Sequence, residues 1–420
     1  MIRYQSTSEF SEILFSCRVA FSKRSWPYVV AMAIPWLVQS GQRHIRRLGL
    51  RAAWKRHESS FYRFFSRFKF RPQVFFQSLL LLIVQSFWLR EILIVVDDTL
   101  CPKWGKHIFG TASFSDHVRR PRPGYIWGHN WVVLAVVVPL FGVPVALPFW
   151  VSLYRTEKRC LKGEFRTRLE IVVEVLKIVQ TWVSLLISLV ADGAYNNQSI
   201  LKPLAKMKIP LVSRLRFDAV LRHDAPKRRA KKRGRKPRYG SPFPKLQRIS
   251  RSGGGWRKVW VRIYRKRVRL KIKSFDAWWP KAGVQIRVVI TRDLACKRKP
   301  CFLSSTDLGL TPIQIVERFA LRWPIEQLFS DTKLLLGLDL AEVRTPNSVL
   351  RHAIFAFALV TWARVWAKKC FGRLVDPPLS FAGQLSGLRR DLLGQTIFAS
   401  IPGGKLSKRN AQDLAALAAA

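Results

Sequence analysis

Four residues in the C-terminal third of the chain have side chains and a spacing that suit phosphoryl transfer. Phe319, Arg322, Glu326 and Lys333 stand 3, 4 and 7 residues apart in the run ERFALRWPIEQLFSDTKLLLGL. At about 100° per residue, all four positions fall within roughly 60° of the first on a helix. The spacing therefore predicts one helical face that carries an acid flanked by two bases.

Pro324 interrupts this expected helix just before the acid. Proline removes a helix hydrogen bond and can kink the axis. With a kink, the one-face geometry holds only from Ile325 onward. The kink can also tilt Glu326 toward a neighbouring sheet.

Two aspartates upstream each follow an apolar run that predicts a β-strand. Asp97 ends the first run, in VVDDTL, and Asp192 ends the other, in LVADGAY. Asp98 is adjacent to Asp97, and neighbouring strand residues point to opposite faces, so only one of the pair belongs to a common site. We favour Asp97 and keep Asp98 as the alternative.

Three carboxylates meeting in this way fit a metal-dependent site. Cleavage of a phosphodiester by two metal ions needs carboxylates that bridge and flank ions roughly 4 Å apart. Mg²⁺ prefers oxygen ligands and keeps several waters, so three side chains are enough. We expect Asp97, Asp192 and Glu326 to be the catalytic residues and the ligands of two Mg²⁺ ions, for which Mn²⁺ substitutes.

The other acids have simpler explanations. Asp331 lies about 140° around the helix from Glu326, and Asp339 follows Gly337 in an expected turn, so we expect both to be solvated or capping residues. A helix between the strands carries three glutamates that predict surface pairs with nearby bases: Glu164, Glu170 and Glu174 with Arg166, Arg168 and Lys177.

The charge of the whole chain indicates a polyanionic partner. Its 420 residues include 74 Lys plus Arg against 25 Asp plus Glu, a formal net charge of +49, and 49% are hydrophobic. This hydrophobic content excludes a largely disordered chain, and the charge favours DNA, with RNA and anionic membrane as alternatives. A basic DNA-binding protein without catalysis is the alternative to an enzyme.

Cysteine usage and the N-terminus favour the cytoplasm. The six cysteines are scattered without a CxxC pair, which predicts reduced thiols. The first ten residues, MIRYQSTSEF, lack the apolar stretch and cleavage site of a signal peptide.

Residues 131–153 are uncharged for long enough to span a bilayer. However, Pro139, Gly142, Pro144 and Pro148 break the run, and its flanks are rich in valine. Three prolines suit a spanning helix poorly. We therefore predict a buried strand-turn-strand and no membrane partner, with a membrane span as the alternative.

The order of expected elements indicates the fold class. Strands are predicted in EILIVVDDTL and, as a pair, in 131–153; a helix follows in RLEIVVEVLKIVQTW. LLISLVADGAY predicts a fourth strand, NNQSILKPLAKMK a short helix and IPLVSRLRF a fifth strand. Three antiparallel strands followed by helices alternating with parallel strands predict an α/β fold with an RNase H-like mixed sheet, in which the ends of the first and fourth strands can be neighbours.

This order divides the chain into five expected regions. Residues 1–90 form an all-α DNA-binding domain, and 91–220 the first part of the RNase H-like core. Residues 221–300 form a basic, β-rich insertion, and 301–350 return to the core with the Glu326 helix, which Thr311 and Gln314 begin as a capping box. Residues 351–420 are expected to be helical and to serve in dimerisation.

The N-terminal region carries a basic helix in SSFYRFFSR. Ser59 or Ser60 is the expected N-cap. We expect Arg63 and Arg67 to contact DNA phosphates. The phenylalanines of this helix are expected to fill the core: Phe61, Phe64 and Phe65.

The basic insertion has two halves. Residues 222–273 hold 22 Lys or Arg and one acid, Asp224. The first half predicts a phosphate-binding loop with four bases: Arg233, Arg235, Lys236 and Arg238. The second half alternates apolar and basic residues and predicts a β-ribbon with one charged face. Its apolar positions are Val259, Val261, Ile263, Val268, Leu270 and Ile272.

The two aspartate motifs and the Arg-x3-Glu-x6-Lys element together resemble the DDE transposases of bacterial insertion sequences. One branch of that family has a Tyr-x2-Arg-x3-Glu-x6-Lys signature, which stands here as Phe319, Arg322, Glu326 and Lys333. The resemblance covers roughly residues 40–350, including the SSFYRFFSR stretch and the basic insertion.

The resemblance implies a DNA transposase that cuts DNA at the ends of its element and joins the freed 3′-hydroxyl to target DNA. It implies that Asp97, Asp192 and Glu326 bind two metal ions and that Arg322 and Lys333 hold DNA phosphates. The partner would be double-stranded DNA, bound by a homodimer. Phe319 lacks the hydroxyl with which the signature tyrosine contacts the transferred strand. Four tryptophans are candidates for stacking on an extruded base or for core packing: Trp256, Trp260, Trp278 and Trp279.

Overall fold

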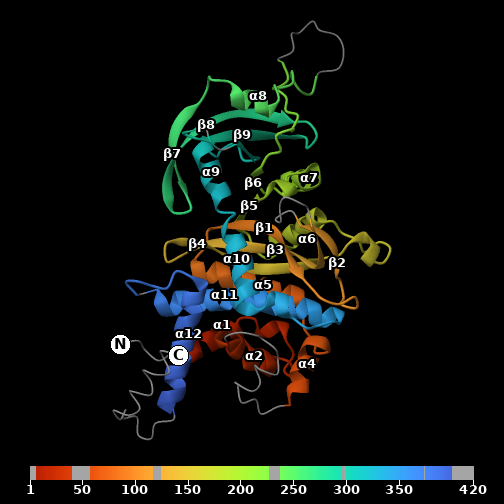
Figure 1. The fold of residues 1–420 in the computed structure, drawn as a ribbon, viewed down its shortest axis with the longest axis vertical. Helices are drawn as coiled ribbons and strands as arrows, with labels where there is room; N and C mark the ends of the chain where they lie inside the picture. Colours follow the sequence, from red (N-terminus) through yellow and green to blue (C-terminus); the bar gives the residue numbers. More distant parts are fainter. Residues whose placement is uncertain are drawn as a thin grey trace.

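The structure is a computed structural model of the 420-residue chain (Figure 1). It describes residues 6–39, 57–116, 124–226, 237–295, 297, 299–372 and 374–399. Three bases of the predicted phosphate-binding loop lie outside the described residues: Arg233, Arg235 and Lys236.

One mixed sheet of ten strands runs through the molecule. Its order is β2-β3-β1-β5-β6-β10-β9-β8-β7, with β4 paired to β3. The strands are β1 Glu91–Pro102, β2 Ala112–Asp116, β3 Gly124–Leu140, β4 Val143–Tyr154, β5 Leu186–Ala191, β6 Leu211–Arg214, β7 Arg257–Ile263, β8 Lys266–Trp279, β9 Val284–Asp293 and β10 Cys301–Ser305.

Five of these strands have RNase H-like topology. β4 pairs antiparallel with β3, and β3 pairs antiparallel with β1. β1, β5 and β6 are parallel neighbours in that order. The predicted fold class is therefore confirmed: an α/β protein with a mixed RNase H-like sheet. The short strand β2, which pairs with the start of β3, was not predicted.

The apolar run at 131–153 is a β-hairpin. β3 and β4 pair along their length, and Phe141 and Gly142 form the turn with φ of 52° and 74°. The prediction of a strand-turn-strand is confirmed. Within the described parts of the chain, one helix is long and apolar enough to cross a membrane, Pro346–Phe371, and 89% of its most apolar window is buried in the protein.

Helices cover the sheet and form a further layer beyond it (Figure 1). The α-helices are α1 Ser6–Phe15, α2 Trp26–Val38, α4 Glu58–Ser66, α5 Pro72–Phe87, α6 Arg168–Gln180, α7 Gln198–Lys206, α8 Leu246–Arg251, α9 Pro312–Ala320, α10 Pro324–Leu336, α11 Pro346–Phe371 and α12 Phe381–Ala399. Single-turn 3₁₀ helices are η1 Arg18–Ala20, η2 Glu157–Arg159, η3 Gly193–Tyr195 and η4 Leu338–Leu340.

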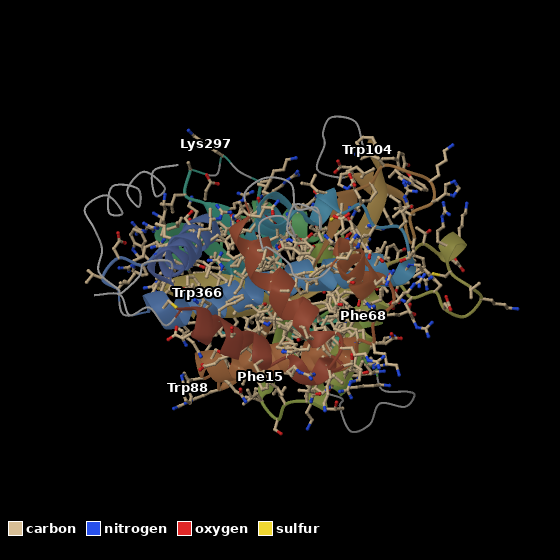
Figure 2. All side chains as sticks on the ribbon, turned by 90° about the horizontal axis from the view of Figure 1, so that it is seen from below. Phe15, Phe68, Trp88, Trp104, Lys297 and Trp366 are labelled. Carbon is tan, nitrogen blue, oxygen red and sulfur yellow. The ribbon has the colours of Figure 1, made fainter. Side chains whose placement is uncertain are left out.

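Helix α11 joins the N-terminal helices to the sheet. It packs against β4 on one side and against α1 and α4 on the other. Trp362 and Trp366 of α11 are fully buried, and Figure 2 shows Trp366 inside the molecule, whereas Trp104, 93% exposed, stands at its periphery. One continuous apolar core therefore spans the helical layer and the sheet.

Local sequence signals explain where several helices begin. Thr311 and Gln314 form the predicted capping box of α9, and Thr167 begins α6 in the same way. The N-cap of α4 is His57, not Ser59 or Ser60, because its Nδ1 accepts the Ser59 N–H. The phenylalanines of α4 are buried as predicted: Phe61, Phe64 and Phe65.

The signature residues do not lie on one helix. Helix α9 ends at Ala320 and α10 begins at Pro324, so the predicted continuous face is wrong. Proline at the first position of a helix has no hydrogen bond to lose, so Pro324 starts a new helix rather than kinking an old one. Glu326 thus lies in the first turn of α10, where the helix dipole favours a carboxylate.

The second half of the basic insertion is the predicted β-ribbon. β7 and β8 form an antiparallel hairpin that extends the sheet beyond β9. Its six apolar positions face a second small core together with Ile315 and Val316 of α9. The hairpin therefore packs one face on α9 and leaves the other face exposed.

Candidate active site

The register of two parallel strands brings the two aspartates together. β1 and β5 are paired from Glu91 opposite Leu186 to Val96 opposite Ala191. Asp97 and Asp192 are the next residues on the two strands. Because neighbouring strands are spaced by roughly 5 Å, the two aspartates lie side by side at the point where β5 ends and β1 continues.

Arg322 connects this point to the third carboxylate. Its Nη1 donates a hydrogen bond to Asp97 Oδ2 at 2.8 Å. Its Nη2 donates to Glu326 Oε1, and the two residues form an i,i+4 ion pair. Arg322 therefore holds Glu326 of α10 against the middle of β1.

The charges of this cluster are coupled. Burial raises the pKa of Asp97 to about 7; Arg322 opposes this rise, and the nearby Asp98 and Asp192 add to it. Burial acts to lower the pKa of Arg322, but Asp97, Glu326 and Asp192 raise it overall. All three predicted carboxylates thus act on one guanidinium.

Asp98 points to the other face of β1, as neighbouring strand residues must. Its Oδ2 accepts from Arg168 Nη1 at 2.7 Å and from Asn130 Nδ2 at 3.1 Å, and its Oδ1 accepts from the Tyr195 hydroxyl at 3.1 Å. These partners satisfy Asp98 away from Arg322. Asp97 is therefore the residue of the pair that shares a site with Glu326.

Lys333 lies two turns beyond Glu326 on α10. Its Nζ donates to the Leu100 carbonyl oxygen of β1 at 2.6 Å. The lysine thus ties α10 to the strand that carries Asp97. Lys333 belongs to the same region as the carboxylates, and its ammonium is engaged with the backbone.

The remaining predicted DNA-binding residues lie elsewhere. Arg63 and Arg67 are exposed on α4, which Figure 1 shows at the far end of the molecule from the β7–β8 hairpin. Arg238 is exposed on the insertion, with its guanidinium 5.4 Å from the centroid of the Tyr239 ring. The structure therefore does not bring these arginines to the carboxylates.

Tyr264, which lies at the tip of the β7–β8 hairpin, was not among the predicted site residues. Tyr264 and Arg265 both have positive φ, 49° and 69°, an uncommon pair for residues other than glycine. The Tyr264 ring packs edge-on against Trp323, with centroids 5.5 Å apart. Burial raises its pKa, with Arg322 and Glu326 as further influences of opposite sign. The hairpin therefore places the Tyr264 ring beside Trp323, the residue that follows Arg322.

The predictions for the other acids are partly wrong. Asp331 is 8% exposed and pairs with the buried Arg364, so it is not solvated. Asp339 follows Gly337, the left-handed C-cap of α10, within η4. Glu174 pairs with Arg166 as expected. Three other expectations change: Glu164 pairs with Arg155, Glu170 completes the capping box of α6, and Arg168 binds Asp98.

The four candidate tryptophans have different environments. Trp256 lies beside Lys273 and Arg292, and Trp260 is 53% exposed between Arg267 and Arg269. Trp278 donates to Asp224 at 2.7 Å. Trp279 is buried in the core at 7% exposure. Of these four, only Trp260 has most of its side chain available to a partner.

Two of the three predicted carboxylates, Asp97 and Glu326, bind a guanidinium. Among the described residues, no group of three His, Cys, Asp or Glu side chains is close enough to hold one metal ion. The cation between Asp97 and Glu326 is Arg322. The donor set is nevertheless made of hard carboxylate oxygens, and it already binds a cation.

The RNase H-like topology, with Asp97 in the middle of β1 and Asp192 just after β5, defines a nuclease-type fold and site. The sequence matches the family described as DDE superfamily endonuclease over residues 18–267. This match covers more than half of the chain, and the protein belongs to that family. The matched region includes Asp97 and Asp192 and ends before Glu326.

The chain was also compared with curated proteins and with solved structures. Comparison with curated proteins gave no match. Among solved structures, the chain is similar to a piggyBac transposase synaptic complex with hairpin DNA, at 10% sequence identity and a TM-score of 0.45. That similarity covers 98% of this chain and 84% of the other.

Proposed function

We propose that this endonuclease-family protein is a DNA transposase of an insertion sequence. It would cut DNA at the ends of the element and join the freed 3′-hydroxyl to target DNA, acting as a homodimer in the cytoplasm. The observations that carry the proposal are the bonds of Arg322 to Asp97 and Glu326 and the position of Asp192 on the strand beside Asp97. Membership of the DDE superfamily endonuclease family supports DNA cleavage as the reaction.

The carboxylates are chemically suited to two Mg²⁺ ions, with Mn²⁺ as a substitute. Their oxygens are the ligands that Mg²⁺ prefers, and the Arg322 guanidinium already stands where Asp97 and Glu326 accept a positive charge. Asp97, Asp192 and Glu326 would hold the ions. Bound ions of this kind stabilise the attacking and leaving oxygens of an in-line displacement.

The chain's own residues would position the DNA strand. Arg322, once released from the carboxylates, offers a fork of donors that matches a phosphate. Lys333 provides a point charge on the helix that carries Glu326, and the Tyr264 ring packs on Trp323, the residue after Arg322. These groups would fix the scissile phosphate against the edge of β1 and β5.

The outer face of the β7–β8 hairpin supports DNA as the partner. Lys258 lies opposite Lys271, Trp260 opposite Arg269, and Arg262 opposite Arg267. Like charges directly opposite each other destabilise a sheet. Because five cations and one exposed tryptophan share this face, a polyanion is the partner that would relieve their repulsion.

A cleavage and strand-transfer assay tests the proposal. The substrate is the DNA that flanks the encoding gene, incubated with Mg²⁺ or with EDTA. We expect Mg²⁺-dependent nicking that is lost in Asp97→Ala, Asp192→Ala and Glu326→Ala, each of which keeps its fold and DNA affinity. Full strand transfer by any one of these variants would overturn the assignment. DNA binding without nicking by the wild type would favour a non-catalytic DNA-binding protein.

A further inference from the structure

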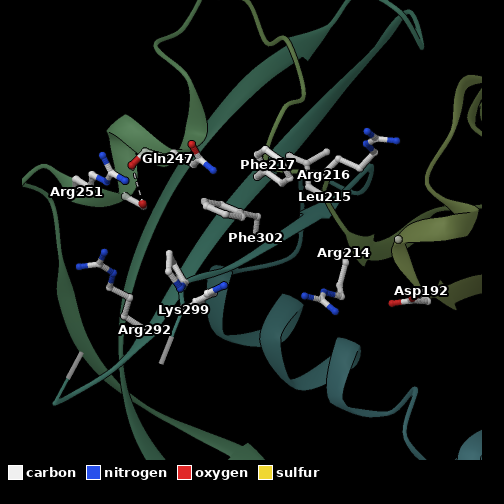
Figure 3. A pocket seen from close by; sticks show the side chains of 13 residues that line it. Asp192, Arg214, Leu215, Arg216, Phe217, Gln247, Arg251, Arg292, Lys299 and Phe302 are labelled. Carbon is white, nitrogen blue, oxygen red and sulfur yellow. Dashed lines mark hydrogen bonds between the residues drawn. The ribbon is translucent and has the colours of Figure 1, made fainter. Parts of the chain in front are cut away.

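A cavity of about 700 Å³ opens beside Asp192 (Figure 3). Residues at the end of β6, on α8 and just before β10 line it. Asp192 and Gly193 lie at one side, and Gln247 and Ser250 of α8 lie at another. The functions proposed above for the carboxylates, Arg322, Lys333 and Tyr264 leave this space unused.

The cavity is strongly cationic. Its lining contains one acid, Asp192, and five bases: Arg214, Arg216, Arg251, Arg292 and Lys299. Arg216 is paired with Asp218 at 2.8 Å, but the other four bases form no ion pair with any residue that the structure describes. A concave surface with this excess of positive charge attracts anions.

Arg292 has a hydrogen-bond donor without an acceptor. Its Nε is buried and has no hydrogen-bond partner in the described part of the chain. Its guanidinium lies over the Trp256 ring, 5.6 Å from the centroid, which holds the side chain in place. A buried donor without a partner is costly, and the Arg292 side chain also lines the cavity.

Two phenylalanines stand among these bases. Phe217 is 55% exposed, and Phe302 is half-buried. Figure 3 shows both rings lying between α8 and the side of the cavity that carries Arg214 and Lys299. Aromatic faces interleaved with unpaired bases are typical of sites for single-stranded nucleic acid, in which bases stack and phosphates meet cations.

The size of the cavity favours single-stranded over double-stranded DNA. A volume of about 700 Å³ is in the range of small-ligand sites. A double helix, whose major groove alone is about 12 Å wide, cannot enter it. The space suits a segment of about two nucleotides.

We propose that this cavity holds a short single-stranded DNA segment next to the phosphodiester at Asp192. Its phosphates would lie on Arg251, Arg292 and Lys299, and a base would lie against Phe217 or Phe302. The proposal rests on the DNA cleavage proposed above and specifies the form of DNA next to the cut: an unpaired strand.

Binding of two DNA substrates tests this site. One is a blunt fluorescent duplex, and the other is the same duplex with an unpaired extension of about two nucleotides; both are titrated in EDTA, which prevents cleavage. We expect the wild type to bind the extended duplex about tenfold more tightly. Phe217→Ala should abolish this difference, because base stacking contributes about five- to hundredfold in affinity.

The charge contribution is measured separately. Arg251 and Lys299 are exposed, so Arg251→Ala/Lys299→Ala should fold normally. It should also abolish the preference and reduce the salt slope for the extended duplex by about 0.7 per lost contact. Phe217→Ala should leave that slope unchanged. The matched control removes two exposed lysines of α7, Lys202→Ala/Lys206→Ala, and should keep the preference.

Equal affinity of the wild type for both duplexes would overturn the proposal. So would a preference that survives in both Phe217→Ala and Arg251→Ala/Lys299→Ala. Nicking of blunt DNA with Mg²⁺ is assayed in parallel. If the wild type nicks DNA but binds both duplexes equally, the single-strand site is wrong and the proposed activity stands. If it prefers the extended duplex but does not nick DNA, the proposed activity is wrong and the single-strand site stands.

Discussion

Arg322 donates a hydrogen bond to Asp97 at 2.8 Å and so occupies the position of a cation between two predicted metal ligands. The guanidinium must leave before divalent ions bind to both carboxylates. Hydrogen bonds to charged groups contribute about 1.5–3 kcal/mol. We therefore expect Arg322→Ala to bind Mn²⁺ about tenfold more tightly than the wild type in the absence of DNA.

Calorimetric titration of the DNA-free protein measures this affinity. Arg168→Ala is the matched control, because Arg168 pairs with Asp98 on the other face of β1 and its loss should leave Mn²⁺ binding unchanged. Arg322→Ala should also lose DNA cleavage, since the phosphate would lose its holder. Weaker Mn²⁺ binding by Arg322→Ala would contradict the idea that the guanidinium and the ions compete.

Substitutions at the two adjacent aspartates of β1 should have different effects: one on DNA cleavage and the other on stability. Asp97→Asn should abolish cleavage without lowering the free energy of unfolding, because a pKa raised by burial to about 7 means that the folded protein favours the uncharged side chain. Asp98→Asn weakens hydrogen bonds with Arg168 and Tyr195, so it should cost about 1–3 kcal/mol and keep measurable cleavage. Chemical denaturation and a nicking assay on both variants measure the two effects. Loss of cleavage in Asp98→Asn, with cleavage kept in Asp97→Asn, would show that Asp98 is the catalytic residue of the pair.

Tyr264 should contribute to DNA positioning through its hydroxyl. Phe319 provides none, while Tyr264 packs on Trp323 beside Arg322. A backbone strained at two non-glycine positions is a feature of functional sites. We expect Tyr264→Phe to leave stability within about 0.5 kcal/mol and to reduce the single-turnover cleavage rate about tenfold. Tyr239→Phe, elsewhere on the insertion, is the control, and equal rates for Tyr264→Phe and wild type would remove the role.

The outer face of the β7–β8 hairpin should determine how strongly DNA binding depends on salt. Each phosphate contact contributes about 0.9 to the slope of log affinity against log salt for duplex DNA. Lys258→Ala, Arg262→Ala and Arg267→Ala, each removing an exposed base, should each lower the slope by about that amount. Anisotropy titrations at several salt concentrations measure it. Lys162→Ala, an exposed lysine far along the chain, should leave the slope unchanged.

Strand topology could be predicted from the sequence because it depends on local patterns. The runs that lead to Asp97 and Asp192 are apolar and bounded by polar residues, so their strands and the pairing that brings the two aspartates together follow from pattern and fold rules. The turn between β3 and β4 could be predicted in the same way, because Gly142 lies within the apolar run and adopts a positive φ. These signals lie within a few residues of the features that they specify.

The contacts that complete the site could not be predicted in this way. Pro324 is compatible with a kinked helix or with a new helix, and only packing decides between them. The Arg322–Asp97 bond joins residues 225 positions apart. Tyr264 lies in a two-residue hairpin turn that lacks the usual Asn-Gly signal, and the cavity at Asp192 is assembled from separate segments.

Buried histidines should make folding sensitive to acid. Burial lowers the pKa of His352 to about 3, where it packs on Trp36 with ring centroids 5.1 Å apart. Its folded pKa lies below the unfolded value of about 6.5, so the unfolded state takes up a proton first as pH falls. The stability that neutral His352 contributes is therefore complete above pH 6.5 and is lost progressively toward pH 3, by about 1.4 kcal/mol per pH unit.

Comparing His352→Gln with the wild type isolates this contribution. Asp97 acts in the opposite direction, since its raised pKa adds stability as pH falls through about 7, and His129, with a pKa lowered by burial to about 4, acts like His352. Both are present in each protein and cancel in the difference. We expect the free energy of unfolding of His352→Gln to rise relative to the wild type by about 1.4 kcal/mol per pH unit between pH 6 and 4, measured by guanidinium denaturation. The exposed control His107→Gln should follow the wild type, and parallel curves for all three proteins would show that His352 does not titrate with folding.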